Sequence, residues 1–134
     1  MRLWHIDLIP YLPKSQLLAQ WRELNSIFKK QDKHILINYI YKYDDKYLFD
    51  YACMVLKEFR ARGFQIKNTI NFYNYFYDFG YSASIPLKDK YEYKFDEHNF
   101  AYLTICYYNL GEKYLRGQKD FTDDVWERLD KFYQ

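Results

Sequence analysis

The stretch LLAQWRELNSIF, residues 17–28, decides the fold of the first half of this chain. Its apolar residues recur at helical spacing, which predicts a helix that buries one side. Small and charged residues share the opposite side, where an adjacent Arg and Glu have open space on either hand. These residues are Ala19, Arg22, Glu23 and Ser26. We interpret this face as a candidate site rather than a plain solvent face.

Three long helices are predicted. The first begins at Ser15, a suitable N-cap, and ends near residue 28 or 30. The second covers residues 45–62 and ends at Gly63, which suits a left-handed C-terminal cap. The third follows Asp96 as N-cap, continues to about Arg116 and lies centrally because several of its faces are apolar.

The remaining segments are predicted to be shorter or irregular. Residues 1–14 contain Pro10 and Pro13 and are expected to be extended or irregular. Residues 29–45 are expected to form a loop with short ordered pieces, and a short helix is expected to end near Gly80. Thr122 is expected to cap a last short helix. The expected fold is therefore all-α: a compact single domain over residues 1–134, with three main helices.

Composition narrows the class of protein. A length of 134 residues fits one domain, and 49% hydrophobic residues exclude wholesale disorder. No apolar run approaches the roughly 20 residues needed to span a bilayer, and the N-terminus does not resemble a signal peptide, so we expect a cytoplasmic protein with no membrane partner. The net charge of +2 is only mildly basic. Nucleic-acid binding therefore has to come from local clusters of basic residues.

The cysteines and tyrosines have simple structural interpretations. Cys53 and Cys106 lie among apolar neighbours and are expected to be reduced core residues. Two separated cysteines and three scattered histidines do not have the spacing of a zinc site, so no metal and no cofactor are expected. The 17 tyrosines can fill the edge of a core or stack on bases, and their number decides between neither.

Several short segments agree in order and spacing with one known family. They are Met1-Arg2, Trp21-Arg22-Glu23-Leu24 with Phe28, Lys33-His34, Arg62-Gly63-Phe64, Ile66-Lys67 with Thr69, and, more weakly, Gly111-Glu112-Lys113. Together they resemble the pyrimidine-dimer DNA glycosylase/AP lyase family, the endonuclease V-like enzymes. The resemblance covers the first 70 residues best. It implies a helical fold whose N-terminal segment packs inward between helices.

The resemblance also implies a chemistry. The nucleophile is the N-terminal α-amine, here that of Met1, because the bulky Arg2 is expected to prevent removal of the methionine. An α-amine has an ordinary pKa of about 7.7–8.0, so part of it is neutral at physiological pH. Glu23 has the acid/base role in a Schiff-base reaction that removes a damaged base and then cleaves the strand by β-elimination.

The DNA contacts follow from the same resemblance. The implied DNA-binding positions are Arg2, Arg22, Ser26, Lys33 and His34. Ser26 stands where the family has a basic residue, which removes one phosphate contact. For Lys33 and His34 an ordinary role in the loop is an equal alternative. The implied partner is double-stranded DNA that is damaged or abasic, bound by a monomer.

Other interpretations stay open at this stage. Arg22 and Glu23 can be an ordinary exposed pair on a helix. The chain can also be an inactive nucleic-acid-binding module, or a helical interaction protein whose aromatic residues form core and interface. The family's aromatic C-terminal segment is absent, and Asp123-Asp124 are acidic where the family is basic. The substrate lesion is therefore left open.

Overall fold

A computed structural model describes residues 1–79 and 91–134 of the chain. These residues form helices and no strands, as predicted. The long helices are α1 (Lys14–Lys30), α2 (Asp45–Ala61) and α4 (Phe100–Leu115), and the shorter ones are α3 (Ile70–Tyr75) and α5 (Asp123–Tyr133). Three 3-10 helices complete the fold: η1 (Ile6–Tyr11), η2 (Asn38–Lys42) and η3 (Tyr77–Phe79). Within the described ranges no helix is long and apolar enough to cross a membrane.

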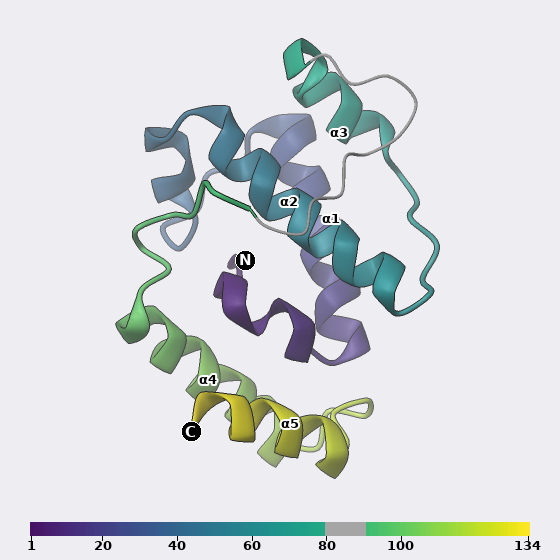
Figure 1. The fold of residues 1–134 in the computed structure, drawn as a ribbon, viewed down its shortest axis with the longest axis vertical. Coiled ribbons are helices and arrows are strands. Elements are labelled where there is room, and N and C mark those ends of the chain that lie inside the picture. Colours follow the sequence, from purple (N-terminus) through teal and green to yellow (C-terminus); the bar gives the residue numbers. More distant parts are fainter. Residues whose placement is uncertain (80–90) are drawn as a thin grey trace.

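The N-terminal segment lies inside the fold. Helix α1 packs against α2 and α3, and α4 packs against α5. Helix η1 contacts α2 on one side and α5 on the other, so the start of the chain lies between these two groups of helices (Figure 1). Leu3, Leu8 and Ile9 are completely buried. The prediction that the N-terminal segment packs inward between helices is confirmed.

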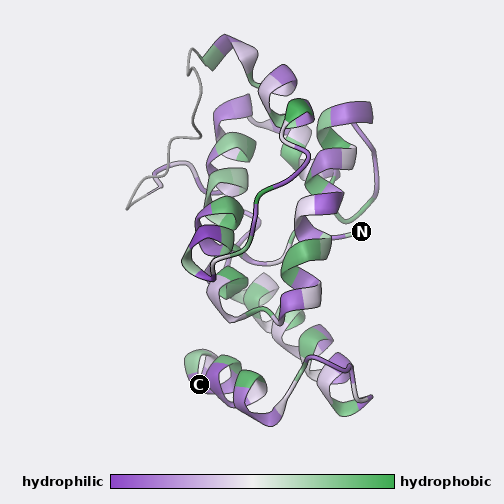
Figure 2. Cartoon of the chain, turned by 90° about the vertical axis from the view of Figure 1, so that its right-hand side faces the viewer, coloured by the Kyte–Doolittle hydropathy of each residue, from purple (hydrophilic) through white to green (hydrophobic). Residues whose placement is uncertain are grey.

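Aromatic rings hold α1 in place. Trp21 packs edge-on against Phe28 and Phe59, and Phe72 of α3 contacts both Trp21 and Phe28. The indole N–H of Trp21 donates to the backbone carbonyl of Lys67 at 2.8 Å. Because the apolar side of α1 is anchored in this way, its other side is fixed toward the start of the chain. Figure 2 shows the same division along the helices, with hydrophobic and hydrophilic faces on opposite sides.

The end of α2 confirms the predicted helix stop. Gly63 has φ +74°, a left-handed conformation that favours glycine. The backbone N–H of Phe64 donates to the carbonyl of Phe59 at 2.9 Å, and the two rings are in contact. This is the hydrogen-bond pattern of a Schellman cap with its hydrophobic contact. Thr122 is likewise the N-cap of α5, accepting from the Val125 N–H.

Two predicted helix starts are wrong. Helix α1 begins at Lys14 after Pro13, and the N–H of Ser15 donates instead to the Asp120 carboxylate at 2.6 Å. Helix α4 is capped by Asn99, whose side chain accepts from the Tyr102 N–H, and not by Asp96. At α1 a carboxylate distant in the sequence, that of Asp120, accepts from the backbone N–H of Ser15. At α4 a second capping residue, Asn99, takes the role that was predicted for Asp96.

Helix α4 is also less central than predicted. It packs mainly against α5, and Phe100 at its start is 71% exposed, although the apolar pattern placed this residue in the buried stripe. Cys106 and Leu110 are fully buried, so the helix buries one side only. Both cysteines are buried, as predicted. The predicted loop at residues 29–45 contains the short helix η2, and the segment 1–14, predicted to be extended or irregular, contains η1. Gly80, near which a short helix was expected to end, lies outside the described residues.

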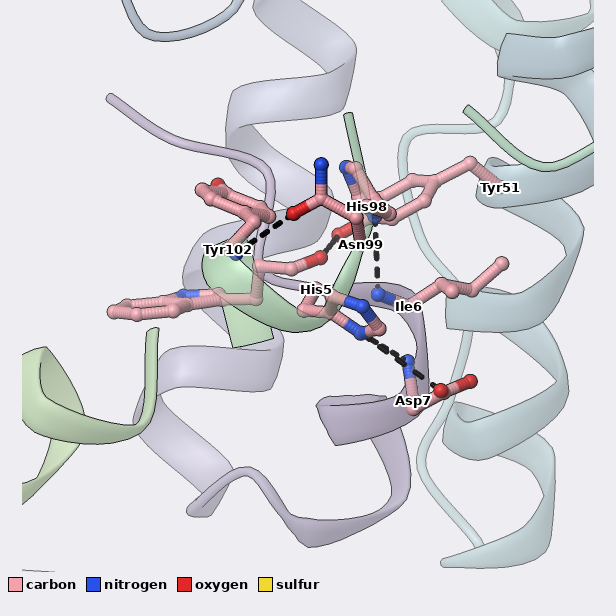
Figure 3. A network of polar contacts seen from close by, with 8 residues as sticks. His5, Ile6, Asp7, Tyr51, His98, Asn99 and Tyr102 are labelled. Carbon is pink, nitrogen blue, oxygen red and sulfur yellow. Dashed lines mark hydrogen bonds and ion pairs between the residues drawn. The ribbon is translucent and has the colours of Figure 1, made fainter. Parts of the chain in front are cut away.

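Two neighbouring histidines, His5 and His98, hold the N-terminal segment in place (Figure 3). The Ile6 N–H donates to Nδ1 of His98 at 3.1 Å, and the other ring nitrogen of His98 lies 2.7 Å from the Tyr39 hydroxyl. His5 stacks beside His98 and accepts from the Asp7 N–H. Burial, together with the positive charge of His5, lowers the pKa of His98 to about 3. His98 is therefore neutral in the folded protein near neutral pH.

This histidine predicts a loss of stability in acid. The pKa of His98 is lower in the folded chain than its unfolded value of 6.5, so the unfolded chain binds the additional proton. Stability from this group is fully present above pH 6.5 and falls as the pH falls toward about 3, at about 1.4 kcal/mol per pH unit. In His98→Asn the amide oxygen can still accept from Ile6, but position 98 no longer titrates. We expect its unfolding free energy, measured in urea between pH 4 and 7, to depend less steeply on pH.

The matched control for this measurement is His34→Asn, which removes a histidine at an exposed position. It should leave the steep dependence of the wild-type protein in place. An equally steep loss of stability in His98→Asn would contradict the assignment, because another group would then be responsible for the acid sensitivity.

Candidate functional site

The N-terminus opens into a small pocket between four parts of the chain. Its volume is about 220 Å³. The pocket is lined by the first residues of the chain, by α1, by the loop between α1 and η2, and by α4. The lining residues are Met1, Arg2, Trp4, Gln16, Ala19, Glu23, Leu36, Asn109 and Lys113. The terminal α-amine and the Glu23 carboxylate therefore share one pocket, although they are separated by 22 positions in the sequence.

A buried glutamine connects the start of the chain to α1. Gln20 has no exposed surface, and its side-chain oxygen accepts from the Trp4 N–H at 2.8 Å. Its amide nitrogen donates to the Arg2 carbonyl at 3.1 Å and to the Glu23 carboxylate at 3.3 Å. The orientation of the amide follows from these partners, because a backbone N–H needs an acceptor and a carbonyl needs a donor. The Gln20 side chain thus positions both the N-terminal segment and the Glu23 carboxylate.

Two tyrosine hydroxyls hold the backbone of the same N-terminal segment. Tyr51 of α2 donates to the Trp4 carbonyl at 2.6 Å, and its oxygen lies 3.0 Å from the Gln20 side-chain oxygen. Tyr102 of α4 donates to the Leu3 carbonyl at 2.5 Å. Buried backbone groups need partners, and here side chains from two helices provide them. The backbone is therefore held at several points between Arg2 and Ile6.

Glu23 is half-buried and electrostatically perturbed. Burial raises the pKa of its carboxyl above the ordinary value. The positive charge of the terminal amine, the backbone amide of Arg2, and the charges of Arg22 and Lys113 oppose this shift. The charge of the Met1 amine acts on the Glu23 carboxyl, although the two groups form no ion pair among the described residues. A carboxyl whose pKa is shifted toward neutrality suits proton transfer in both directions.

Arg2 lies beside the pocket and between two rings. Its guanidinium carbon is 5.7 Å from the centre of the Trp4 ring and 5.8 Å from that of Tyr102. Both distances are within the range of cation–π attraction. With Met1 and Lys113, it makes three of the residues that line the pocket positively charged. This balance favours an anionic ligand such as a phosphate.

Arg22 and Glu23 do not share a face, contrary to the prediction. Arg22 is exposed and lines a different pocket, of about 400 Å³, with Trp21, Phe64 and Lys67. Consecutive residues on a helix point about 100° apart, and the inward position of Glu23 turns Arg22 away. Of the four residues on the predicted face, only Ala19 and Glu23 line the N-terminal pocket.

The remaining predicted contacts lie in the loop after α1. Lys33 and His34 are exposed. Nδ1 of His34 accepts from the Leu36 N–H at 3.1 Å, so the histidine has the role of a polar cap in its own loop. The hydroxyl of Ser26 donates to the Asp32 carboxylate. The side chains of His34 and Ser26 organise the loop, and none of the three predicted residues lines the pocket.

A family model matches the first half of the chain. Residues 1–72 match the family model described as pyrimidine dimer DNA glycosylase. The chain belongs to this family. The match includes the N-terminal segment, α1 and α2, which carry Met1, Glu23 and Tyr51. Comparisons with curated proteins and with solved structures gave no significant match.

Membership of the pyrimidine dimer DNA glycosylase family makes DNA the expected substrate class. Two of the residues that line the pocket lie beyond the matched segment: Asn109 and Lys113, both from α4. The second half of the chain therefore completes a site whose first half carries the family resemblance.

Sequence reasoning missed the residues that hold the site together. Gln20 lies between Leu17 and Leu24 on the buried face of α1, and a polar residue inside an apolar stripe is a signal of a buried hydrogen-bond network. Tyr51 and Tyr102 could not be distinguished from the other tyrosines by sequence. Lys113 was part of the family resemblance, but only the fold places it beside Glu23.

Proposed function

We propose that this protein is a DNA repair glycosylase with an associated AP lyase activity, acting on UV pyrimidine dimers or another damaged base. The single observation that supports this most strongly is the shared pocket of the Met1 amine and the Glu23 carboxylate. An amine and a carboxyl with a raised pKa are the two groups that an imine mechanism needs.

The first half of the proposed reaction removes the base. The nitrogen of Met1 attacks C1′ of the damaged nucleotide, and the base leaves with the electrons of the glycosidic bond. The nitrogen then loses a proton, the bond between C1′ and the ring oxygen breaks, and a C1′=N imine forms. Glu23 in its protonated form donates a proton to the ring oxygen as the ring opens. After this step Glu23 is a carboxylate.

The second half cleaves the strand. The imine acidifies the C2′ proton, and the Glu23 carboxylate accepts it. The electrons of the C2′–H bond form a new double bond, and the bond between C3′ and its phosphate oxygen breaks as β-elimination. Water finally hydrolyses the imine and releases Met1. The pocket that Met1 and Glu23 line has a volume of about 220 Å³, which we propose receives the sugar.

Cations around the pocket are suited to hold the DNA. We propose that Arg2 and Lys113 contact phosphates next to the lesion and that Arg22 and Lys33 contact the backbone further away. For His34 and Ser26 the hydrogen bonds inside the loop favour an indirect role in DNA binding. We further propose that residues 1–134 act as one domain, since α4 completes the pocket. We also propose that the protein acts as a monomer.

Borohydride trapping tests the proposed function. We expect a covalent protein–DNA adduct when the protein, bearing its native N-terminus, is incubated with an abasic or UV-irradiated duplex and sodium borohydride, because the reagent reduces the imine. Peptide mapping should place the adduct at Met1. A protein that shifts DNA without being trapped is a binding module, and one that does neither is an interaction protein. Either result contradicts the proposal.

A further inference from the structure

The loop between α1 and η2 exposes two apolar side chains. Ile35 is 85% exposed and Leu36 is 40% exposed. The next residue, Ile37, is completely buried, and Ile40 is nearly so. The loop is therefore anchored in the core by Ile37 and Ile40, whereas Ile35 and Leu36 are not part of the core. A single exposed isoleucine needs no explanation, but an adjacent pair at the edge of a site does.

The loop is held in a defined shape. His34 receives the Leu36 N–H on its ring, and its backbone carbonyl accepts from the N–H groups of Ile37 and Asn38 at 2.8 Å and 2.9 Å. The Asn38 side chain in turn accepts from the His34 N–H at 2.7 Å. These bonds close a tight turn whose tip is residues 35 and 36. The tip is therefore preorganised and does not need to be ordered by a ligand.

The base of the loop is fastened to α1 and η2. The Asp32 carboxylate accepts from the Ser26 hydroxyl, and the Asp32 carbonyl accepts from the Tyr41 hydroxyl. Lys29, Lys30 and Lys33 are exposed on the same stretch of chain. The loop thus presents an apolar tip with cations along its base. This combination fits a duplex, whose bases are apolar on their faces and whose backbone is anionic.

The tip lies at the candidate active site. Leu36 lines the same pocket as Met1 and Glu23, and Ile35 precedes it toward solvent. A nucleotide whose C1′ reaches the Met1 amine therefore has the apolar tip next to it. Within a duplex, C1′ is reached only when the helix is bent or a base is displaced, and proteins that do so insert apolar side chains between base steps.

We propose that Ile35 and Leu36 form a wedge that enters the base stack beside the damaged nucleotide and holds the opened step apart. This inference rests on the proposed function, since it assumes that a duplex is presented to the Met1 pocket. Leu36 fills space next to the sugar, and Ile35 contacts the faces of the neighbouring bases. Lys29, Lys30 and Lys33 hold the phosphates on either side of the opened step.

The test compares Ile35→Ser with the wild-type protein on duplex and single-stranded DNA that carry an abasic site. Ile35 does not line the Met1 pocket, and a single strand has no stack to open. We expect Ile35→Ser to lose roughly tenfold or more in cleavage of the duplex and to keep its cleavage of the single strand. The matched control is Ile70→Ser, which removes a 65% exposed isoleucine from α3, and it should keep both activities.

A second readout does not depend on catalysis. A 2-aminopurine base beside the lesion becomes fluorescent when it is unstacked. Binding of the wild-type protein should raise this fluorescence, while binding of Ile35→Ser should change it little. Equal losses of cleavage on duplex and single strand, or an unchanged fluorescence increase with Ile35→Ser, overturn the wedge. A wild-type protein that unstacks the base but is never trapped by borohydride supports the wedge and refutes the proposed chemistry.

Discussion

Glu23→Gln should lower strand cleavage by about 10²- to 10⁴-fold and leave DNA affinity nearly unchanged. This range is the usual contribution of a positioned acid or base. Glutamine has the same shape and can still accept from the amide nitrogen of Gln20, so the N-terminal strand stays in place. What the variant lacks is a group that can donate a proton to the ring oxygen and accept the C2′ proton. Single-turnover cleavage of an abasic duplex, with affinity measured by fluorescence anisotropy, checks both parts.

The same substitution should make the protein slightly more stable at neutral pH. Burial raises the pKa of the Glu23 carboxyl in the folded chain above its unfolded value, so the folded chain binds the additional proton. Stability from this group is therefore present below the unfolded pKa and is lost as the pH rises through the folded pKa. Removing the charge removes that loss, and thermal unfolding at pH 7 should show a small increase in Tm.

Glu112→Gln is the matched control for this variant. Glu112 is an exposed glutamate on α4 that pairs with Arg116, and it does not line the pocket. Its substitution should change neither cleavage nor stability by a measurable amount. Full cleavage by Glu23→Gln would remove the acid/base assignment, and a drop in stability of that variant would show that the charge of Glu23 is a net stabilising group.

A short extension before Met1 should abolish borohydride trapping and strand cleavage. The extension turns the Met1 amine into an amide, which is no longer a nucleophile. It also adds atoms to a pocket of only about 220 Å³, which the first residues already line. We expect activity below the limit of detection, measured by trapping on an abasic duplex.

The control for the extension is a cleavable tag. A protease that cuts directly before Met1 should restore trapping in the same preparation, and a tag after Gln134 should have no effect, because α5 ends away from the pocket. Undiminished trapping of the extended protein would place the imine on a lysine, with Lys113 as the nearest candidate in the pocket. The proposed role of Met1 would then be wrong.

Much of the fold follows from local patterns in the sequence. The apolar periodicity of residues 17–28 places α1, and the conformational freedom of Gly63 ends α2 at the predicted point. Both signals are local, because a helix face and a left-handed cap depend on residues a few positions apart. The helix starts at Ser15 and Asp96 were predicted wrongly since Asp120 and Asn99 compete for the backbone groups concerned.

The sequence by itself determined the all-α class, the extent of the main helices and the family, and it singled out Met1 and Glu23 as a pair. Only the tertiary structure decided that these two groups share a pocket, that Arg22 turns to another one, and that Lys113 of α4 completes the site. It also revealed that Gln20 links the N-terminal segment to α1. The physical reason is range: periodicity and capping act within a few residues, whereas a pocket is built from side chains that meet only when distant segments pack together.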